Sequence, residues 1–254
     1  IDLSVPFGPI WFGVRRSPLR SEADVIALWK AAQACAGVWV RGVMGYEAQM
    51  AGVPEFVPGK RLQNAAIRSL KRAAAPIIRA RRARLVAALR DAGADLALVN
   101  GGGSGCIAFT REDPSVTEIA VGSAFFAPHL FDGYDDLALH PAAAWMTEVA
   151  RRSDAGRVTV TGGGLVASGA VGIDKCPQPW LPAGLHLSVD EGAGEVQTPL
   201  HGPAAFGLAV GAPVAFRHAK AGELCERFNQ LHVIDADRVI DNWPTYRGAG
   251  QVFV

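Results

Sequence analysis

The alternation of short β-rich runs with longer helical stretches is the feature that most limits how this chain can fold. Over the first 150 residues, runs rich in Val and Ile end at polar or glycine residues and are followed by stretches of helical composition. Such alternation builds βαβ units, because parallel strands need a crossover connection between them. The sequence therefore predicts an α/β fold with a parallel sheet. The expected strands are residues 1–5 continued by 10–14, then 38–44, 95–99 and 116–121.

Two helical connections are predicted between these strands. Ser21 followed by Asp24 has the spacing of an S-x-x-D capping box, which indicates a helix start after the first strand. The second connection runs from about Leu62 to Ala92 and contains Pro76. Because proline breaks or kinks a helix interior, we expect either two helices or one kinked helix there.

The pattern changes after about residue 140. Short apolar runs, many Gly and Pro residues and turn dipeptides replace the long helical stretches, which is typical of a β-rich domain. We therefore predict two domains, an α/β domain over residues 1–140 and a β-rich domain over residues 141–254. The expected strands of the second domain are residues 158–161, 186–189, 213–216 and 231–234.

Composition excludes several other classes of protein. Of the 254 residues, 50% are apolar and 19% are charged, and the net charge is +1, as in ordinary folded globular proteins. The four cysteines lie far apart without a C-x-x-C pair, which argues against disulfides and a zinc cluster and favours a cytoplasmic location. No apolar run approaches the roughly 18 residues of a membrane span, and we expect no signal peptide.

One stretch of the chain is strongly basic. Residues 60–90 hold ten Lys and Arg residues and no acid. Such a face can bind nucleic acid or an anionic membrane. Because the net charge of the chain is near zero and no aromatic residue interrupts this stretch, we favour a solvated outer helix instead. We therefore expect neither nucleic acid nor a membrane as a partner.

Candidate ligand-binding residues follow the predicted strands, because ligands of α/β sheets gather at the carboxyl ends of the strands. Two successive strands end in glycine-rich turns that can direct N–H and hydroxyl donors at one phosphate. The alternative is an ordinary flexible turn. The first turn is neither a Walker A loop nor a dinucleotide fingerprint. The candidate residues are Gly102, Gly103 and Ser104 in the first turn, and Gly122 and Ser123 in the second.

Four further residues are candidates by their type. Arg16 can pair with an anion or a phenolate, or it is an ordinary surface arginine. Tyr46 can stack on a flat ring or pack in the core. His218 and Lys220 follow an apolar run, and this histidine can be a base, a metal ligand or a core residue. No two histidines have the i, i+4 spacing of a metal motif, so spacing alone predicts no metal site.

Taken together, these segments resemble the fold type III pyridoxal phosphate enzymes, specifically the D-threonine aldolase and D-serine dehydratase branch of the alanine racemase superfamily. The matching segments occur in family order across nearly the whole chain. They are Gly13–Pro18, Gly42–Glu47, Val99–Gly105, Thr117–Ser123, Arg217–Lys220 and Pro244–Gly248.

The resemblance implies a (β/α)₈ TIM-type barrel followed by a C-terminal β-domain, with pyridoxal 5'-phosphate bound at the carboxyl ends of the strands in a homodimer. Arg16 would meet the phenolic oxygen of the cofactor, and Tyr46 would stack on its ring. His218 would bind a divalent metal near the substrate hydroxyl. The phosphate cradle would consist of Gly102, Gly103, Ser104, Gly122 and Ser123.

Two departures from the family pattern change what we expect. Lys220 stands where the family has a second metal ligand, and an ammonium group cannot join the shell of a cation, which weighs against a divalent metal. Lys220 is then a candidate proton donor to a departing hydroxyl. The strands resemble only the fifth to eighth of the barrel, and the family's Schiff base lysine has no counterpart after a strand. None of Lys30, Lys60, Lys71 and Lys175 follows a predicted strand in the family's context.

The expected function is that of a lyase acting on D-β-hydroxy amino acids, by elimination of water or by retro-aldol cleavage. An amino-acid racemase of the same fold is the closest alternative, and a non-catalytic cofactor-binding protein is the alternative from another class. Because four barrel strands would leave two unpaired edges, we expect an additional barrel segment to complete the fold. We also expect an extended segment from Arg217 to Lys220 to direct His218 and Lys220 to one face.

Overall fold

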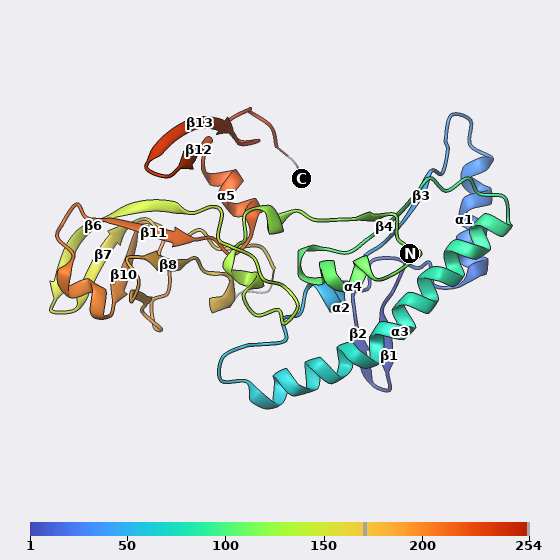
Figure 1. The fold of residues 1–254 in the computed structure, drawn as a ribbon, viewed down its shortest axis with the longest axis horizontal. Helices are drawn as coiled ribbons and strands as arrows, with labels where there is room; N and C mark the ends of the chain where they lie inside the picture. Colours follow the sequence, from blue (N-terminus) through green and yellow to red (C-terminus); the bar gives the residue numbers. More distant parts are fainter. Residues whose placement is uncertain (170–171, 253–254) are drawn as a thin grey trace. The chain divides into compact units, whose positions relative to one another are not determined.

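The computed structural model describes residues 1–169 and 172–252, and the contacts of the chain divide it into two compact units. Unit 1 consists of Ile1–Ala124 and Phe131–Ala138, and unit 2 consists of Phe125–Leu130 and Leu139–Val254. Figure 1 shows helices crossing over between the strands of unit 1 and mainly antiparallel strands in unit 2. The expected combination of an α/β part and a β-rich part is therefore present.

Unit 1 contains a three-stranded parallel sheet in the order β3 (Gly42–Gly45), β4 (Leu98–Gly101) and β5 (Glu118–Ile119). Val43 lies opposite Val99, and both side chains are buried. Because side chains alternate between the faces of a strand, this register directs one face of the sheet at the core. Three of the predicted strands thus form the expected parallel sheet.

The first predicted strand forms a hairpin instead of joining this sheet. β1 (Val5–Phe7) pairs antiparallel with β2 (Ile10–Phe12), and Gly8 in the turn has a φ of +57°. Glycine adopts this left-handed conformation without the steric penalty of a side chain. The expectation of one broken strand across residues 1–14 is wrong because this turn reverses the direction of the chain.

The helices of unit 1 begin close to the predicted positions. α1 (Glu22–Gln33) starts at the capping box, in which Ser21 Oγ accepts the Asp24 N–H at 3.2 Å and the Asp24 carboxylate accepts the Ser21 N–H at 2.9 Å. α3 (Arg61–Asp91) is a single helix of 31 residues that contains Pro76. Of the two forms expected for this connection, the single helix is therefore correct. The short helices are α2 (Ala48–Ala51), η1 (Ser104–Cys106), α4 (Ile107–Arg111), η2 (Ser123–Phe125) and η3 (His129–Phe131).

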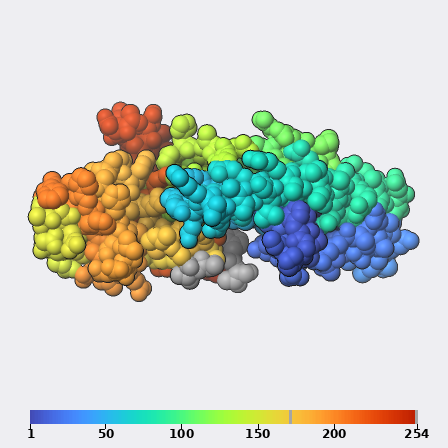
Figure 2. All heavy atoms as spheres, turned by 90° about the horizontal axis from the view of Figure 1, so that it is seen from below, coloured from blue at the N-terminus to red at the C-terminus, as the bar shows by residue number. Residues whose placement is uncertain are grey.

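Apolar contacts on α3 hold unit 1 together. Figure 2 shows the N-terminal hairpin, in dark blue, against this helix, in cyan. Val5 and Phe12 of the hairpin belong to the same buried cluster as Ala74 and Ile78 of α3. A second buried cluster joins α1, β3 and the C-terminal half of α3 through Val25, Val43, Leu85 and Leu89.

Several basic residues of α3 pair with acids from other parts of unit 1. Arg82 and Lys71 are buried, which contradicts the expectation of a uniformly solvated helix. Each is tolerated because a carboxylate compensates its charge in the interior. The ion pairs of this helix are Arg68 with Asp135, Lys71 with Glu55, Arg79 with Glu112, Arg82 with Glu47 and Asp113, and Arg84 with Glu22. Across the described ranges, no helix is long and apolar enough to cross a membrane.

Unit 2 is built on a six-stranded antiparallel sheet in the order β8-β11-β6-β7-β10-β9. Its core contains Trp145 stacked on Phe216, with ring centroids 4.6 Å apart. All four strands that the sequence predicted for this part are present, with shifted ends. The bounds are β6 (Trp145–Asp154), β7 (Arg157–Thr161), β8 (Gln178–Leu181), β9 (His186–Leu187), β10 (Gln197–His201), β11 (Pro213–Arg217), β12 (Gln230–Asp235) and β13 (Arg238–Pro244), with η4 (Ile173–Lys175), η5 (Pro203–Gly207) and α5 (Ala221–Arg227) between strands.

Candidate functional site

A cavity of about 380 Å³ lies in unit 1, beside the end of β3. Arg16 and Tyr46 both line it, together with the segment Trp11–Val14 and Gln49. The volume falls in the range of small-molecule sites, which is roughly 300–1,000 Å³. Two residues singled out from the sequence as ligand contacts thus share one cavity.

Arg16 and Tyr46 also contact each other. The guanidinium carbon of Arg16 lies 5.8 Å from the centroid of the Tyr46 ring, within cation–π range. Arg16 is exposed, whereas Tyr46 is half-buried, and burial raises the pKa of its phenol above the ordinary value. The ring is therefore a neutral, flat surface at physiological pH.

The glycine-rich turn after β4 packs directly against Tyr46. A Cβ atom on Gly103 would lie 3.1 Å from the Tyr46 ring and 3.0 Å from Ala51. Gly102 has a φ of +91°, and a Cβ there would lie 3.1 Å from Ile119. Gly102 therefore needs glycine for its left-handed backbone, whereas a Cβ at Gly103 would require Tyr46 or Ala51 to move by a few tenths of an ångström.

The two glycine-rich turns lie beside each other, as the sequence predicted. β4 and β5 are parallel neighbours, with Gly101 opposite Ile119. Ser104 Oγ accepts the backbone N–H of Ala124 at 3.0 Å. A Cβ on Gly122 would meet nothing within 4 Å, so space is open at the second turn.

One predicted donor is already engaged within the protein. The Gly102 N–H donates to Glu47 Oε2 at 2.6 Å, so it does not point at a ligand. The role of Gly102 in the turn is therefore its backbone conformation, while the expected phosphate contacts of Gly103, Ser104, Gly122 and Ser123 stay predictions.

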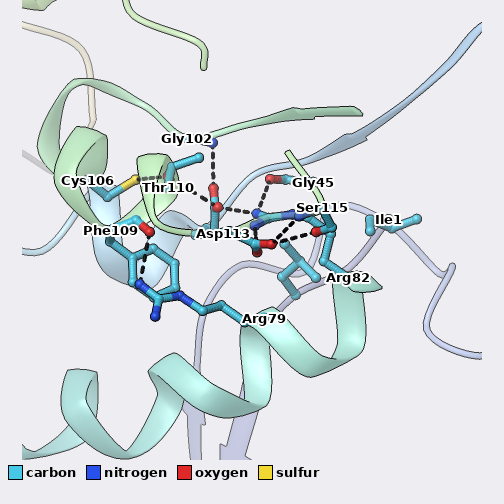
Figure 3. Close-up of polar contacts among 12 residues, drawn as sticks. Ile1, Gly45, Arg79, Arg82, Gly102, Cys106, Phe109, Thr110, Asp113 and Ser115 are labelled. Atoms are coloured by element: carbon cyan, nitrogen blue, oxygen red, sulfur yellow. Dashed lines mark hydrogen bonds and ion pairs between the residues drawn. The ribbon is translucent and has the colours of Figure 1, made fainter. Parts of the chain in front are cut away.

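Sequence reasoning missed a buried ionic cluster behind this turn. Arg82 reaches from α3 to Asp113 at 2.5 Å and to the Gly45 carbonyl at 3.1 Å (Figure 3). It also donates to the Glu47 carboxylate. The side chains of Arg82 and Glu47 are 0% exposed, and that of Asp113 is 1% exposed. The sequence contains only a weak indication of this cluster. Glu47 directly follows Tyr46 in the segment Gly42–Glu47, which matches the family, and Arg82 is one of the ten basic residues among residues 60–90.

His218 lies in unit 2 and is fully buried. Burial, followed by the nearby His129 and Arg217, lowers the pKa of its imidazole to about 4, and a backbone contact with Ala143 opposes them. The Phe126 ring stands edge-on to it, with centroids 6.2 Å apart. The imidazole is thus neutral at pH 7, the form that can accept a proton or bind a metal.

Lys220 also lies in unit 2 and has a different neighbour. Its Nζ donates to the Ser168 carbonyl at 2.6 Å, and its backbone N–H donates to Glu223 Oε1 at 2.6 Å. β11 ends at Arg217, so the extended strand that was expected to align His218 with Lys220 stops before both. Within the described residues, no three His, Cys, Asp or Glu side chains gather to hold a metal ion.

The other lysines lie in or beside helices. Lys30 is in α1, Lys60 precedes α3, Lys71 pairs with Glu55 and Lys175 pairs with Asp174.

Comparisons with known proteins show likeness in structure only. No protein-family model and no curated protein matches the sequence. The structure is similar to a D-threonine aldolase from Filomicrobium marinum, with a TM-score of 0.72 and 19% identity over 89% of this chain and 57% of the other. It is also similar to the D-threo-3-hydroxyaspartate dehydratase from Delftia sp. HT23, with a TM-score of 0.69 and 18% identity over 92% of this chain and 63% of the other.

A third similar structure is an alanine racemase-like protein from Idiomarina loihiensis, with a TM-score of 0.61 and 14% identity over 93% of this chain and 63% of that one. The chain thus spans less than two thirds of the length of each of these proteins. Over that span, this chain has the fold of these aldolase, dehydratase and alanine racemase-like structures.

Proposed function

We propose that unit 1 binds pyridoxal 5'-phosphate and that the chain is part of a lyase acting on D-β-hydroxy amino acids. The observation that carries the proposal is the continuity of the site. Arg16 contacts Tyr46, Tyr46 packs on Gly103, and Ser104 joins the turn to the loop after β5. The similarity to an aldolase and a dehydratase of D-hydroxy amino acids supports the choice of substrate class.

The residues present fit this cofactor. A phosphate ester needs N–H and hydroxyl donors, and the two turns bring Ser104 and Ser123 to the ends of neighbouring strands. A flat aromatic ring needs an apolar surface, which Tyr46 offers at the cavity wall. A phenolate oxygen needs a cation, and Arg16 lines the same cavity.

Bound pyridoxal phosphate supplies an electron-poor ring that takes up the electron pair released when a bond at the substrate Cα breaks. The residues of the protein would orient the cofactor and the substrate, and they would move protons. Arg16 would hold the phenolic oxygen of the cofactor, and Tyr46 would stack on its ring. Lys220 is proposed to donate a proton to a departing hydroxyl, and His218 is proposed as a neutral base or metal ligand. A divalent metal is not required by this scheme.

The remaining parts of the enzyme are proposals as well. Because the chain spans about three fifths of the proteins it resembles, we propose that an additional barrel segment and a homodimer complete the active site. The Schiff base lysine would come with that segment, since the lysines of this chain lie in or beside helices or pair with acids. The same observation favours the second candidate, a cofactor-binding protein without catalysis.

The test uses the full chain. We expect pyridoxal phosphate to bind at micromolar concentration, seen as a change in its visible absorbance and quenching of tryptophan fluorescence. D-threonine, D-serine and D-3-hydroxyaspartate are then assayed for aldehyde, 2-oxo acid and ammonia. Turnover by the enzyme completed with its additional barrel segment supports the lyase, binding without turnover by that complete enzyme supports the non-catalytic alternative, and conversion of D-alanine to L-alanine supports the racemase. Absence of pyridoxal phosphate binding would contradict the proposal.

A further inference from the structure

Glu47 uses its two carboxylate oxygens on different parts of unit 1. Oε1 accepts from Arg82 of α3 and, at 3.4 Å, from the Thr110 hydroxyl of α4. Oε2 accepts the backbone N–H of Gly102 at 2.6 Å. Glu47 itself follows β3, and Gly102 follows β4. A single buried carboxylate thus connects the ends of two strands to two helices.

The carboxylate has little freedom to leave this position. Its side chain is 0% exposed, and a buried carboxylate is stable only while it is paired. Arg82 is itself anchored by Asp113 at 2.5 Å and by the Gly45 carbonyl at 3.1 Å. The guanidinium therefore fixes Oε1, and the planar carboxylate directs Oε2 at Gly102.

The amide that Glu47 holds is at the entrance of the glycine-rich turn. Gly102 has a φ of +91°, a conformation that is easily reversed in an isolated glycine. A hydrogen bond to a charged acceptor is roughly twice as strong as one between neutral groups. Fixing this amide sets the course of the backbone through Gly103 and Ser104, which pack on Tyr46 and bond to Ala124.

We propose that Glu47 is a positioning residue that presets the anion-binding turn before a ligand arrives. The inference rests on the proposed function, since it concerns how unit 1 holds the phosphate group. It predicts different roles for the backbone amides of the turn. Gly102 gives its N–H to Glu47, and the amides that follow it face the anion.

The matched variants are Glu47→Gln and Asp113→Asn. Both neutralise one carboxylate of the same buried cluster, but only the first contacts Gly102. The side chain in Glu47→Gln has one oxygen and one NH2 group. The NH2 group must point at either Arg82 or the Gly102 N–H, and that donor then loses its acceptor. A merely structural role predicts similar effects of the two variants, whereas a positioning role predicts that only Glu47→Gln weakens anion binding.

The experiment measures the dissociation constants of pyridoxal phosphate and of inorganic phosphate for the full-length chain and both variants, with melting temperatures as the check of folding. We expect Glu47→Gln to lower both affinities about tenfold and Asp113→Asn to change them less than about twofold, although both melt earlier. Equal losses in the two variants, or unchanged affinity in Glu47→Gln, would overturn the positioning role.

A measurement on the unaltered chain keeps the inference testable if a variant does not fold. In a sample labelled with ¹⁵N at glycine and serine, we expect the Gly102 amide proton to be downfield and protected from exchange without ligand. Added phosphate should then move the Gly103 and Ser104 signals and leave Gly102 nearly unchanged. If added phosphate shifts the Gly102 amide signal the most, the positioning role is overturned while the proposed function stands. No binding of either probe, with Gly102 still protected, would overturn the proposed function and the positioning role with it.

Discussion

Ser104 Oγ accepts the backbone N–H of Ala124 at 3.0 Å, and this one bond joins the turn after β4 to the loop after β5. We expect Ser104→Ala to weaken binding of pyridoxal phosphate about tenfold, because the change removes both this link and a hydroxyl donor. Fluorescence titration of the cofactor measures the effect. The control is Ser115→Ala, which removes a hydroxyl bonded to Asp113 at 2.6 Å outside the turn. Equal affinities of the two variants would contradict the assignment of Ser104.

Arg82→Met should lower the free energy of unfolding by about 3–5 kcal/mol, because it leaves two buried carboxylates without their cation. Urea denaturation followed by circular dichroism measures this loss. Arg84→Met is the matched control on the same helix. Arg84 is exposed and its partner Glu22 is partly exposed, so the expected loss is below about 1 kcal/mol. Similar losses in both variants would show that the buried cluster contributes no more than a surface pair.

Arg16→Ala should weaken cofactor binding by about tenfold or more, because a charge-assisted contact to the phenolate oxygen is lost. Arg15→Ala is the control, since Arg15 lies over the Trp11 ring at 4.1 Å and does not line the cavity. Both variants remove one positive charge, so general electrostatic attraction falls equally. An affinity that drops in both to the same degree would rule out a specific contact from Arg16.

Acidification should destabilise unit 2 through His218. Its folded-state pKa of about 4 lies below the ordinary value of 6.5, so the neutral form is favoured by folding. The resulting stability is fully present above pH 6.5 and is lost as the pH falls toward 4. At roughly 1.4 kcal/mol per pKa unit, the loss amounts to at most about 3 kcal/mol.

His218→Leu provides the comparison for this pH dependence. In urea denaturation between pH 7 and pH 4, we expect the variant to lose less stability than the unaltered chain. Parallel pH profiles of the two proteins would show that the buried imidazole is not responsible for the acid sensitivity.

The complete enzyme should retain turnover after chelation, and Lys220→Ala should lower kcat by roughly 100-fold if this residue is the general acid. Lys175→Ala is the control in the same unit, because Lys175 pairs with Asp174. Loss of activity with a chelator, recovery with zinc or manganese and an indifferent Lys220→Ala variant would together favour a metal mechanism at His218.

The local signals in the sequence predicted the elements that depend on near neighbours. The capping box at Ser21 and Asp24 placed the start of α1, and short apolar runs located β3, β4 and β7. The hairpin of residues 5–12 was missed because the conformation of Gly8 depends on which strand its flanks pair with. Periodicity shows where a strand lies but does not show its partner.

The residues of the candidate site that follow strands could be predicted from the sequence. The buried residues that support the site from α3 could not. Arg16 and Tyr46 follow the expected strand ends and share a cavity. Arg82 lies in the middle of a basic helix, and its burial depends on Glu47 and Asp113, which are 35 and 31 residues away. A pairing at that separation leaves no periodic trace in one sequence, so only the folded chain reveals it.

The buried cluster of Arg82, Glu47 and Asp113 also restricts how this sequence can evolve. Replacing Arg82 alone leaves two carboxylates in the core, and replacing Glu47 alone leaves the guanidinium undercompensated and Gly102 without its acceptor. Replacing these three charged residues by apolar ones one at a time therefore produces a less stable protein at the first substitution. Cellular quality control degrades less stable proteins more readily. Descendants of this chain are therefore expected to keep the three residues together or to exchange them as a set.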